Sequence, residues 1–193
     1  MGQSERTFTR KGASTRNRIV EAARSMLLEK GYEGLVLREL ADSLGITLGN
    51  LQYYFGTREA LALHVLGIEG RRDTELIEAR RRVDTPADTF RFVVRDMAAR
   101  YRGESGRLLL LIIVLAEHRP SFEALCQDSY REFFAAFEGL LAEMKPGLPP
   151  GEVAARARII NALVEGSTFQ VDVGDLDAFL DRVQAEAELI ALG

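Results

Sequence analysis

Apolar residues recur at helical spacing along almost the whole chain, and no segment shows the strict two-residue alternation of a half-buried strand. Near the N-terminus, Ile19, Ala23, Met26 and Leu27 recur three or four positions apart or as neighbours, which is typical of the buried stripe of an amphipathic helix. Glycine and proline interrupt this pattern at intervals. The sequence therefore predicts an all-α fold of about nine helices.

Turn-forming residues separate the expected helices. Gly31 ends the first and Gly45 the second, and Pro86 and Pro150 suit the first turns of two later helices, because proline is tolerated at that position. The predicted helices span residues 15–30, 37–44, 48–55, 58–83, 86–102, 105–118, 120–145, 150–172 and 175–191.

The charge of the chain is unevenly distributed. The net charge is −4 over 193 residues, of which 47% are apolar, so the chain can bury a sizeable core. Residues 1–18 nevertheless carry five Lys or Arg against one Glu, a local excess of +4. We expect this basic segment to be either a solvated tail or a segment that meets nucleic-acid phosphates.

The chain has one cysteine, Cys126, so no intrachain disulfide can form, as expected for a protein of the reducing cytosol. The first thirty residues lack the apolar run of a signal peptide. The longest apolar run, residues 108–116, is shorter than the roughly 20 residues that span a membrane. We therefore expect a cytoplasmic protein with no membrane partner.

A short helix, a turn and a second helix are predicted within residues 37–56. Ala41 is small enough for close helix packing, and Gly45 can adopt the positive φ that a sharp turn requires. Leu51, six residues further on, then closes a small core. This order is typical of a helix-turn-helix, whose second helix enters the major groove of DNA.

The second of these helices combines groups that suit a DNA interface. Gly49 lets the helix approach a groove closely, and Asn50 and Gln52 can hydrogen-bond adenine edges. The hydroxyl of Tyr53 can reach a phosphate. For the aromatic residues, the alternative is core packing: we expect Phe55 to be buried and at least one of the two adjacent tyrosines to be half-buried.

Several pieces of this region occur in the order and at the separations found in one known family. In chain order they are residues 19–23, 29–32, 38–41, 45–47, 51–55 and 57–61. Residues 15–65 thereby resemble the tetracycline-repressor (TetR-like) family of transcriptional regulators. The C-terminal two-thirds of the chain resemble this family only in helical character and length.

Residues 1–14 are polar and are predicted to form a flexible basic arm. The resemblance implies a helix-turn-helix DNA-binding domain at 15–60 and a helical ligand-binding and dimerisation domain at 61–193. It implies a homodimeric regulator, commonly a repressor, that a small apolar or amphipathic effector releases from a palindromic double-stranded DNA operator. The residues that it places at DNA are Arg16, Arg38, Thr47, Leu48, Gly49, Asn50, Gln52, Tyr53, Tyr54, Thr57 and Arg58.

Two positions depart from the family pattern. Val36 stands where a Ser or Thr usually caps the second helix, which loses a cap that contributes about 1 kcal/mol and a phosphate contact. Glu39 occupies the acidic position of a capping box, but the Ser or Thr hydroxyl that would complete the box is missing. Gln52 stands where an aromatic residue is common, so the operator sequence cannot be taken over from relatives.

The C-terminal part is rich in phenylalanine, which predicts an apolar interior and, for most single residues, plain core packing. Some polar and aromatic residues among apolar neighbours are candidates for contacting a ligand. These are Arg95, Tyr101, His118, Phe122, Cys126, Tyr130 and Phe169.

The last two predicted helices carry apolar faces that suit a homodimer interface. Ala162 and Gly166 belong to a small-residue stripe, and Leu180 and Val183 belong to an apolar face on the next helix. Two such helix pairs would form a four-helix bundle. The alternative, packing on the core of the same chain, is expected to account for part of both faces.

The sequence gives no sign of catalysis. It has two histidines, His64 and His118, and no zinc-binding, phosphate-loop or dinucleotide motif. We therefore expect no enzyme, no cofactor and no metal site. Two alternatives remain: a helical small-molecule binding protein with a non-functional DNA module, favoured only by the missing cap at Val36, and a helical hydrolase that uses Cys126.

Overall fold

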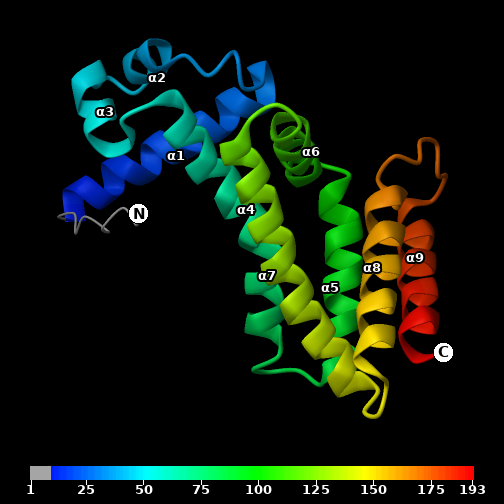
Figure 1. The fold of residues 1–193 in the computed structure, drawn as a ribbon. Coiled ribbons are helices and arrows are strands. Elements are labelled where there is room, and N and C mark those ends of the chain that lie inside the picture. The colour runs from blue at the N-terminus through cyan, green and yellow to red at the C-terminus, as the bar shows by residue number, and fades with distance from the viewer. Residues whose placement is uncertain (1–9) are drawn as a thin grey trace. The chain divides into compact units, whose positions relative to one another are not determined.

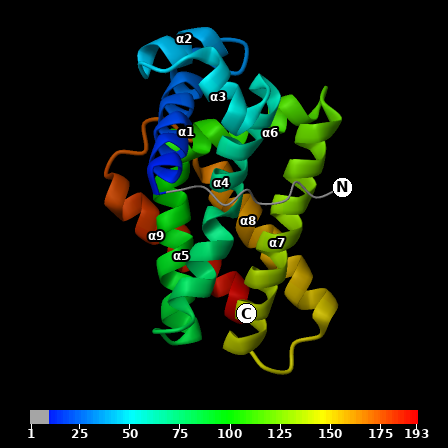
Figure 2. The same ribbon diagram turned by 90° about the vertical axis from the view of Figure 1, so that its left-hand side faces the viewer.

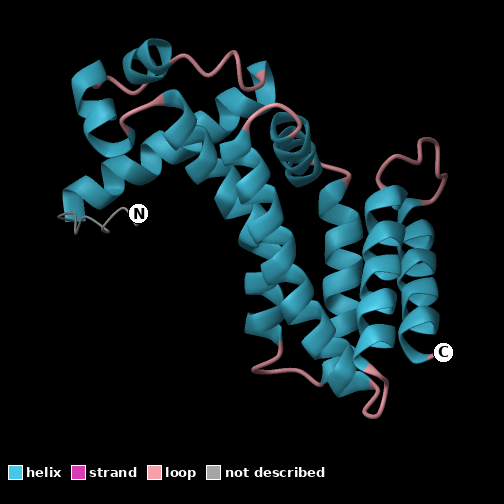
Figure 3. Cartoon of the chain, in the orientation of Figure 1, coloured by secondary structure: helices cyan, strands magenta, loops and turns pink. Residues whose placement is uncertain are grey.

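A computed structural model describes residues 10–193, and every regular element in that range is an α-helix (Figures 1 and 3). The helices are α1 (Arg10–Lys30), α2 (Leu37–Ser43), α3 (Leu48–Phe55), α4 (Arg58–Arg80), α5 (Pro86–Tyr101), α6 (Glu104–Ala116), α7 (Pro120–Met144), α8 (Pro150–Ser167) and α9 (Leu176–Leu192). The predicted all-α fold is confirmed. Within the described range, no helix combines the length and apolar character needed to cross a membrane.

Two helix ends differ clearly from the prediction. Helix α1 begins at Arg10 instead of residue 15, because Arg, Lys and Ala favour helix and a cap at Ser14 is not obligatory. The part of the expected basic arm at 1–9 lies outside the described residues. Helix α8 ends at Ser167, five residues early, because Arg102 donates a hydrogen bond of 2.8 Å to the Ser167 carbonyl that the next helical turn would need.

The chain divides into two compact units, residues 1–66 (unit 1) and residues 67–193 (unit 2). The sequence placed this boundary at residue 60. Helix α4 is continuous from Arg58 to Arg80, so its first nine residues belong to unit 1 and the rest to unit 2.

Unit 1 is built on a small apolar core. Helices α1, α2 and α3 each bury one face, and the first turns of α4 complete the core. Its fully or almost fully buried side chains are Ile19, Ala23, Leu27, Leu35, Leu40, Ala41, Leu51, Leu61, Ala62, Val65 and Leu66. Ala41 and Leu51 lie in this core, as the helix-turn-helix pattern predicts.

The turn between α2 and α3 is a Schellman motif. Gly45 adopts φ +66, and its N–H donates to the Asp42 carbonyl at 3.1 Å, while the Ile46 N–H donates to the Ala41 carbonyl at 3.1 Å. Arg18, from α1, donates to the Leu44 carbonyl at 3.0 Å. These bonds satisfy the last carbonyls of α2 and fix the direction in which α3 begins.

Helix α2 begins without a side-chain cap. Val36 occupies the N-cap position with extended backbone (φ −95, ψ 112), and its side chain is 40% exposed. Glu39 pairs instead with Lys30, at 2.9 Å between Oε2 and Nζ. The first N–H groups of α2 therefore receive no side-chain acceptor from the N-cap residue.

We expect Val36→Thr to stabilise unit 1 by about 1 kcal/mol, because threonine has nearly the same shape and its hydroxyl can accept from the N–H of Glu39. Hydrogen exchange of the α2 amides, together with thermal unfolding followed by circular dichroism, would measure the gain. Val83→Thr is the matched control, since Val83 is 76% exposed and caps no helix. Equal effects of the two substitutions would rule out capping as the cause.

Unit 2 is a helical bundle. Helices α5, α8 and α9 pack against one another and run side by side in Figure 1, and α7 packs against α8 and α6. Figure 2 shows the same ribbon turned by 90°, with α7 visible along its length. This helix has 25 residues.

The core of this bundle contains a group of stacked aromatic residues from α5 and α7. The rings of Phe90 and Phe137 stack with centroids 5.8 Å apart, and Phe133 stacks on Phe137 at 5.3 Å. Ile160 and Val164 of α8 are buried in the same cluster. Core formation therefore accounts for these three phenylalanines, whereas Phe92 and Phe169 are exposed.

Candidate DNA-binding face and ligand cavity

Helix α3 has one buried and one exposed face. Leu51 and Phe55 are buried in unit 1, and Phe55 is 8% exposed, as predicted. Asn50, Gln52 and Tyr53 lie on the exposed face, where the Tyr53 side chain is 57% exposed. Such a helix is anchored by its apolar side and presents amide and phenol groups to the solvent.

Two threonines cap the helices at either end of this region. The Thr47 hydroxyl accepts from the Asn50 N–H at 3.1 Å, and the Thr57 hydroxyl accepts from the Ala60 N–H at 3.0 Å. Each hydroxyl thereby fixes a helix start and keeps its own proton to donate. Helix N-termini with such donors are favourable positions for phosphate oxygens.

Gly49 is the second residue of α3, is exposed, and has a conventional helical backbone. A Cβ atom placed on it would have no neighbour within 4 Å. The fold of unit 1 therefore does not require glycine at this position, and the absence of a side chain leaves α3 free to approach another molecule closely. Leu48, the first residue of the helix, is partly buried.

The three arginines expected at DNA differ in their surroundings. Arg38 is exposed on α2. Arg16 lies over the Phe55 ring, 5.2 Å from its centroid, and its Nη2 is 3.3 Å from His64 Nδ1. Arg58 lies over the Tyr32 ring at 4.5 Å and pairs with Glu33 at 3.1 Å. Arg16 and Arg58 therefore also hold unit 1 together.

The adjacent tyrosines contact each other edge to face, with centroids 5.3 Å apart. Tyr54 is partly buried, whereas Tyr53 is exposed. This arrangement matches the expectation that one of the two would be half-buried.

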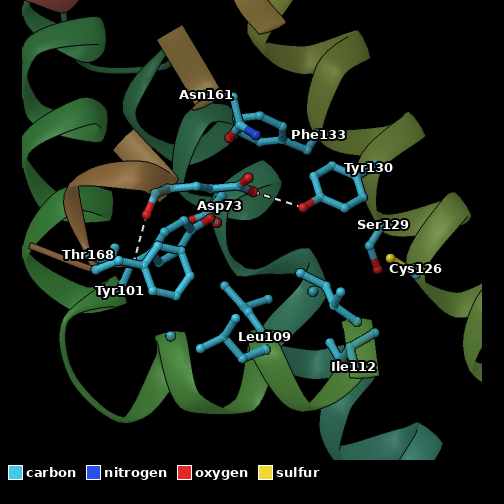
Figure 4. A pocket seen from close by; sticks show the side chains of 16 residues that line it. Asp73, Tyr101, Leu109, Ile112, Cys126, Ser129, Tyr130, Phe133, Asn161 and Thr168 are labelled. Atoms are coloured by element: carbon cyan, nitrogen blue, oxygen red, sulfur yellow. Dashed lines mark hydrogen bonds between the residues drawn. The ribbon is translucent and has the colours of Figure 1, made fainter. Parts of the chain in front are cut away.

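Unit 2 contains a cavity of about 120 Å³ (Figure 4). Its wall is mainly apolar, with leucine, isoleucine and aromatic side chains from α5, α6 and α7 and several polar groups from α4 and α8. The residues that line it are Gly70, Asp73, Tyr101, Gly106, Leu109, Leu110, Ile112, Ile113, Cys126, Ser129, Tyr130, Phe133, Asn161, Glu165, Thr168 and Phe169.

Two glycines of the wall are required by their surroundings. A Cβ on Gly106 would lie 1.7 Å from the Tyr101 carbonyl oxygen, and a Cβ on Gly70 would lie 2.4 Å from Ser129 Oγ. Gly106 therefore permits the tight corner between α5 and α6, and Gly70 permits the close approach of α4 to α7.

One polar group of the wall is a compensated carboxylate. Asp73, of which 7% of the side chain is exposed, accepts hydrogen bonds from the Arg100 guanidinium and from the Tyr101 hydroxyl. Burial, and then the charge of Asp73, hold the pKa of Tyr101 well above its ordinary value. Tyr101 is therefore a neutral hydrogen-bond donor at ordinary pH.

A second carboxylate, Glu165, accepts a hydrogen bond of 2.8 Å from the Tyr130 hydroxyl, shown as a dashed line in Figure 4. Burial, and then the charge of Glu165, raise the pKa of Tyr130. The same two causes raise the pKa of the Cys126 thiol. Both groups therefore stay neutral, and Cys126 lacks the thiolate character that a nucleophile needs.

The structure brings four of the seven expected ligand contacts to this cavity, namely Tyr101, Cys126, Tyr130 and Phe169. The other three lie elsewhere. Arg95 pairs with Asp177 and Asp181 at 3.0 Å each and so connects α5 to α9 at the surface. His118 is exposed in the turn after α6, and Phe122 is completely buried as core.

Sequence reasoning missed the polar residues that define the wall. Asp73, Asn161 and Glu165 line the cavity, yet none was named as a ligand contact. A signal existed for Asp73, because it precedes buried Ile77 by four positions and therefore shares its helix face. Asn161 likewise follows buried Ala157 by four positions.

Helices α8 and α9 leave apolar side chains on the surface of the single chain. Ile159 is 54% and Leu189 is 65% exposed, and Ala162 and Gly166 extend the exposed stripe on α8. The opposite faces of the same helices are buried in unit 2. The expected stripe is thus exposed on α8, whereas the predicted apolar face of α9, with Leu180 and Val183, is buried in the core of the same chain because it packs against α5 and α8.

The sequence of unit 1 matches a known protein family. Residues 19–65 match the model described as bacterial regulatory proteins, tetR family. Unit 1 therefore carries the sequence signature of the tetR family over residues 19–65. Among curated tetR-type relatives, the HTH-type transcriptional regulator PksA of Bacillus subtilis is 33% identical over 63 residues, 33% of this chain and 31% of the relative. The chain spans about a third of the length of the first curated relatives that it matches.

The whole fold is similar to solved structures. A protein of Mesorhizobium loti assigned as a TetR-family transcriptional regulator aligns with a TM-score of 0.76 and 20% identity, covering 95% of this chain and 97% of that one. A protein of Saccharomonospora viridis assigned as a transcriptional regulator, solved in complex with choline, aligns with a TM-score of 0.70 and 17% identity, covering 91% and 94%. These likenesses show that the chain shares its fold with these two proteins.

Proposed function

We propose that this protein is a homodimeric, ligand-responsive transcriptional repressor. The observation that carries the proposal is the exposed face of α3, where Asn50, Gln52 and Tyr53 project from a helix anchored by buried Leu51 and Phe55. Amide side chains on such a helix are suited to reading base edges in the major groove.

The proposed DNA contacts fall into two groups. Leu48, Gly49, Asn50 and Gln52 lie nearest the bases. The phosphate contacts are Arg16, Arg38, Thr47, Tyr53, Tyr54, Thr57 and Arg58. Of these, Arg38 offers an exposed guanidinium, and Thr47 and Thr57 offer hydroxyl protons at helix starts.

A homodimer through the exposed stripes of α8 and α9 would present two copies of α3 to successive major grooves, about 34–36 Å apart. A palindromic operator follows from the two-fold symmetry. The exposure of Ile159 and Leu189 in the single chain supports this interface.

The cavity of unit 2 is proposed to receive the effector. The choline complex of the Saccharomonospora viridis relative supports a small-ligand role for this fold. Helix α4 runs from Arg58 to Arg80 and contributes Asp73 to the wall, so it is the element through which ligand binding would change DNA affinity. Coupling of about 1–3 kcal/mol would change that affinity roughly 5- to 150-fold.

Selection of duplexes from a random pool, followed by fluorescence anisotropy at several salt concentrations, tests the DNA-binding function. We expect a salt-dependent affinity for a palindrome, lowered roughly tenfold to a hundredfold by Asn50→Ala with Gln52→Ala, because both amides read bases. Gln127→Ala, an exposed amide on α7, is the matched control and should leave the affinity unchanged. Failure of the wild type to enrich any duplex would contradict the proposal.

The second candidate is a small-molecule binding protein whose DNA module is inactive, and the uncapped start of α2 at Val36 is the observation in its favour. The same selection separates the two candidates. A regulator enriches a palindrome, whereas a pure binding protein enriches none and still binds its ligand in unit 2.

A further inference from the structure

We propose that the cavity of unit 2 selects a small organic cation, whose ammonium group lies at Glu165 and whose apolar part lies among the aromatic side chains. This inference rests on the proposed ligand-responsive function and names the chemical class of its effector.

The charges of the wall support a cation. Among the described residues that line the cavity, Asp73 and Glu165 are acidic and none is Lys, Arg or His. Asp73 already has a cationic partner in Arg100, which also pairs with Asp96. Within the described part of the chain, the Glu165 carboxylate accepts only the hydrogen bond from Tyr130. A partly buried carboxylate without a cation is costly, and a bound ammonium would compensate it.

A buried amide points to a ligand independently of this charge. Asn161 is 6% exposed and lines the cavity (Figure 4). Within the part of the chain that the structure describes, its side chain makes no hydrogen bond. A buried amide normally has a partner, so this group is positioned to bond a polar atom of a molecule in the cavity.

The aromatic rings of the wall favour a positive group over a neutral one. Tyr101, Tyr130 and Phe133 are contributed by α5 and α7, and Phe169 follows α8. Cations are attracted to the faces of such rings, most strongly where both are desolvated. Because both phenols stay protonated, they add no further negative charge.

The volume limits the size of the ligand. A cavity of about 120 Å³ is slightly smaller than the engineered cavity of roughly 150 Å³ that holds benzene. A single ring is therefore near the upper limit for the apolar part of the ligand, with its ammonium group outside that apolar space at Glu165. Leu109 and Ile112 would contact its apolar part.

Isothermal titration of the full-length protein with benzylammonium, benzyl alcohol and benzoate tests the proposal, because the three probes are similar in size and differ in charge. We expect benzylammonium to bind roughly 10- to 100-fold more tightly than benzyl alcohol, since a hydrogen bond to a charged group adds about 1.5–3 kcal/mol. Benzoate should bind most weakly, because its charge repels Glu165.

Glu165→Gln keeps the side-chain shape and removes the charge. In this variant we expect benzylammonium to lose roughly tenfold or more in affinity and benzyl alcohol to be unaffected, which also reports that the cavity is intact. Glu132→Gln, an exposed carboxylate on α7, should leave all three affinities unchanged. If Glu165→Gln fails to fold, the order of the three probe affinities for the wild type decides between a cation site and a neutral site.

The outcomes separate the two proposals. Binding of benzyl alcohol or benzoate as tight as that of benzylammonium overturns the cation inference and leaves a ligand-responsive function standing. Binding of no probe overturns the inference together with the effector site, while the operator selection still tests DNA binding on its own. Benzylammonium binding that Glu165→Gln does not weaken also overturns the inference.

Discussion

Gly49→Leu is expected to abolish sequence-specific DNA binding while the protein remains fully folded. A side chain at this position meets no atom of the protein within 4 Å, and glycine is among the least favourable helix residues, so stability should stay equal or rise by up to about 1 kcal/mol. The leucine would separate α3 from the base edges. Because each good base contact discriminates by about 1–3 kcal/mol, operator affinity should fall roughly a hundredfold or more.

Fluorescence anisotropy on the selected operator measures this loss, and thermal unfolding measures the stability. Gly151→Leu is a closely matched control: Gly151 is also the second residue of a helix, is exposed, and has no atom within 4 Å of its Cβ position. It should give the same gain in stability with unchanged DNA binding. Undiminished operator affinity of Gly49→Leu would contradict the proposed orientation of α3 on DNA.

Glutamate at both Ile159 and Leu189 is expected to convert the proposed homodimer into a folded monomer. These side chains are 54% and 65% exposed in the single chain, so glutamate disturbs no core contact of unit 2. In the proposed dimer, the same substitutions would bury like charges without partners. Sedimentation should then give a mass near the 21.5 kDa of one chain instead of twice that value.

The monomer should also lose roughly 10²- to 10⁴-fold in affinity for the palindrome, because two linked half-site contacts bind far more tightly than one. Binding to a single half-site should be unchanged. Val83→Glu is the control for an added surface charge, since Val83 is 76% exposed and lies between α4 and α5. A double variant that still sediments as a dimer would place the interface elsewhere.

The sequence predicted the number of helices and most of their ends because the local signals are strong. Gly45, Pro86 and Pro150 mark turns or first helical turns that depend on backbone chemistry alone. The end of α8 was missed because it depends on Arg102, which is 65 residues away in sequence from the Ser167 carbonyl that it binds. A contact at that separation leaves no trace in a local pattern.

The two candidate sites differed in how far they could be anticipated. The exposed residues of α3 follow from one short helix, in which Leu51 and Phe55 define the buried side. The cavity is assembled from α4 to α8, so its lining depends on how five helices pack. Arg95 was assigned to it wrongly for this reason: its neighbours in sequence are apolar, but its ion pairs are with α9.

The glycines of the cavity wall restrict how the ligand preference can be redesigned. A methyl group on Gly106 would overlap the Tyr101 backbone, and one on Gly70 would displace the Ser129 hydroxyl. Engineering a smaller chamber must therefore start from other positions. Trimming Leu109 or Ile112 instead enlarges it, so a biosensor derived from this protein would be easier to retune toward bulkier analytes than toward slighter ones.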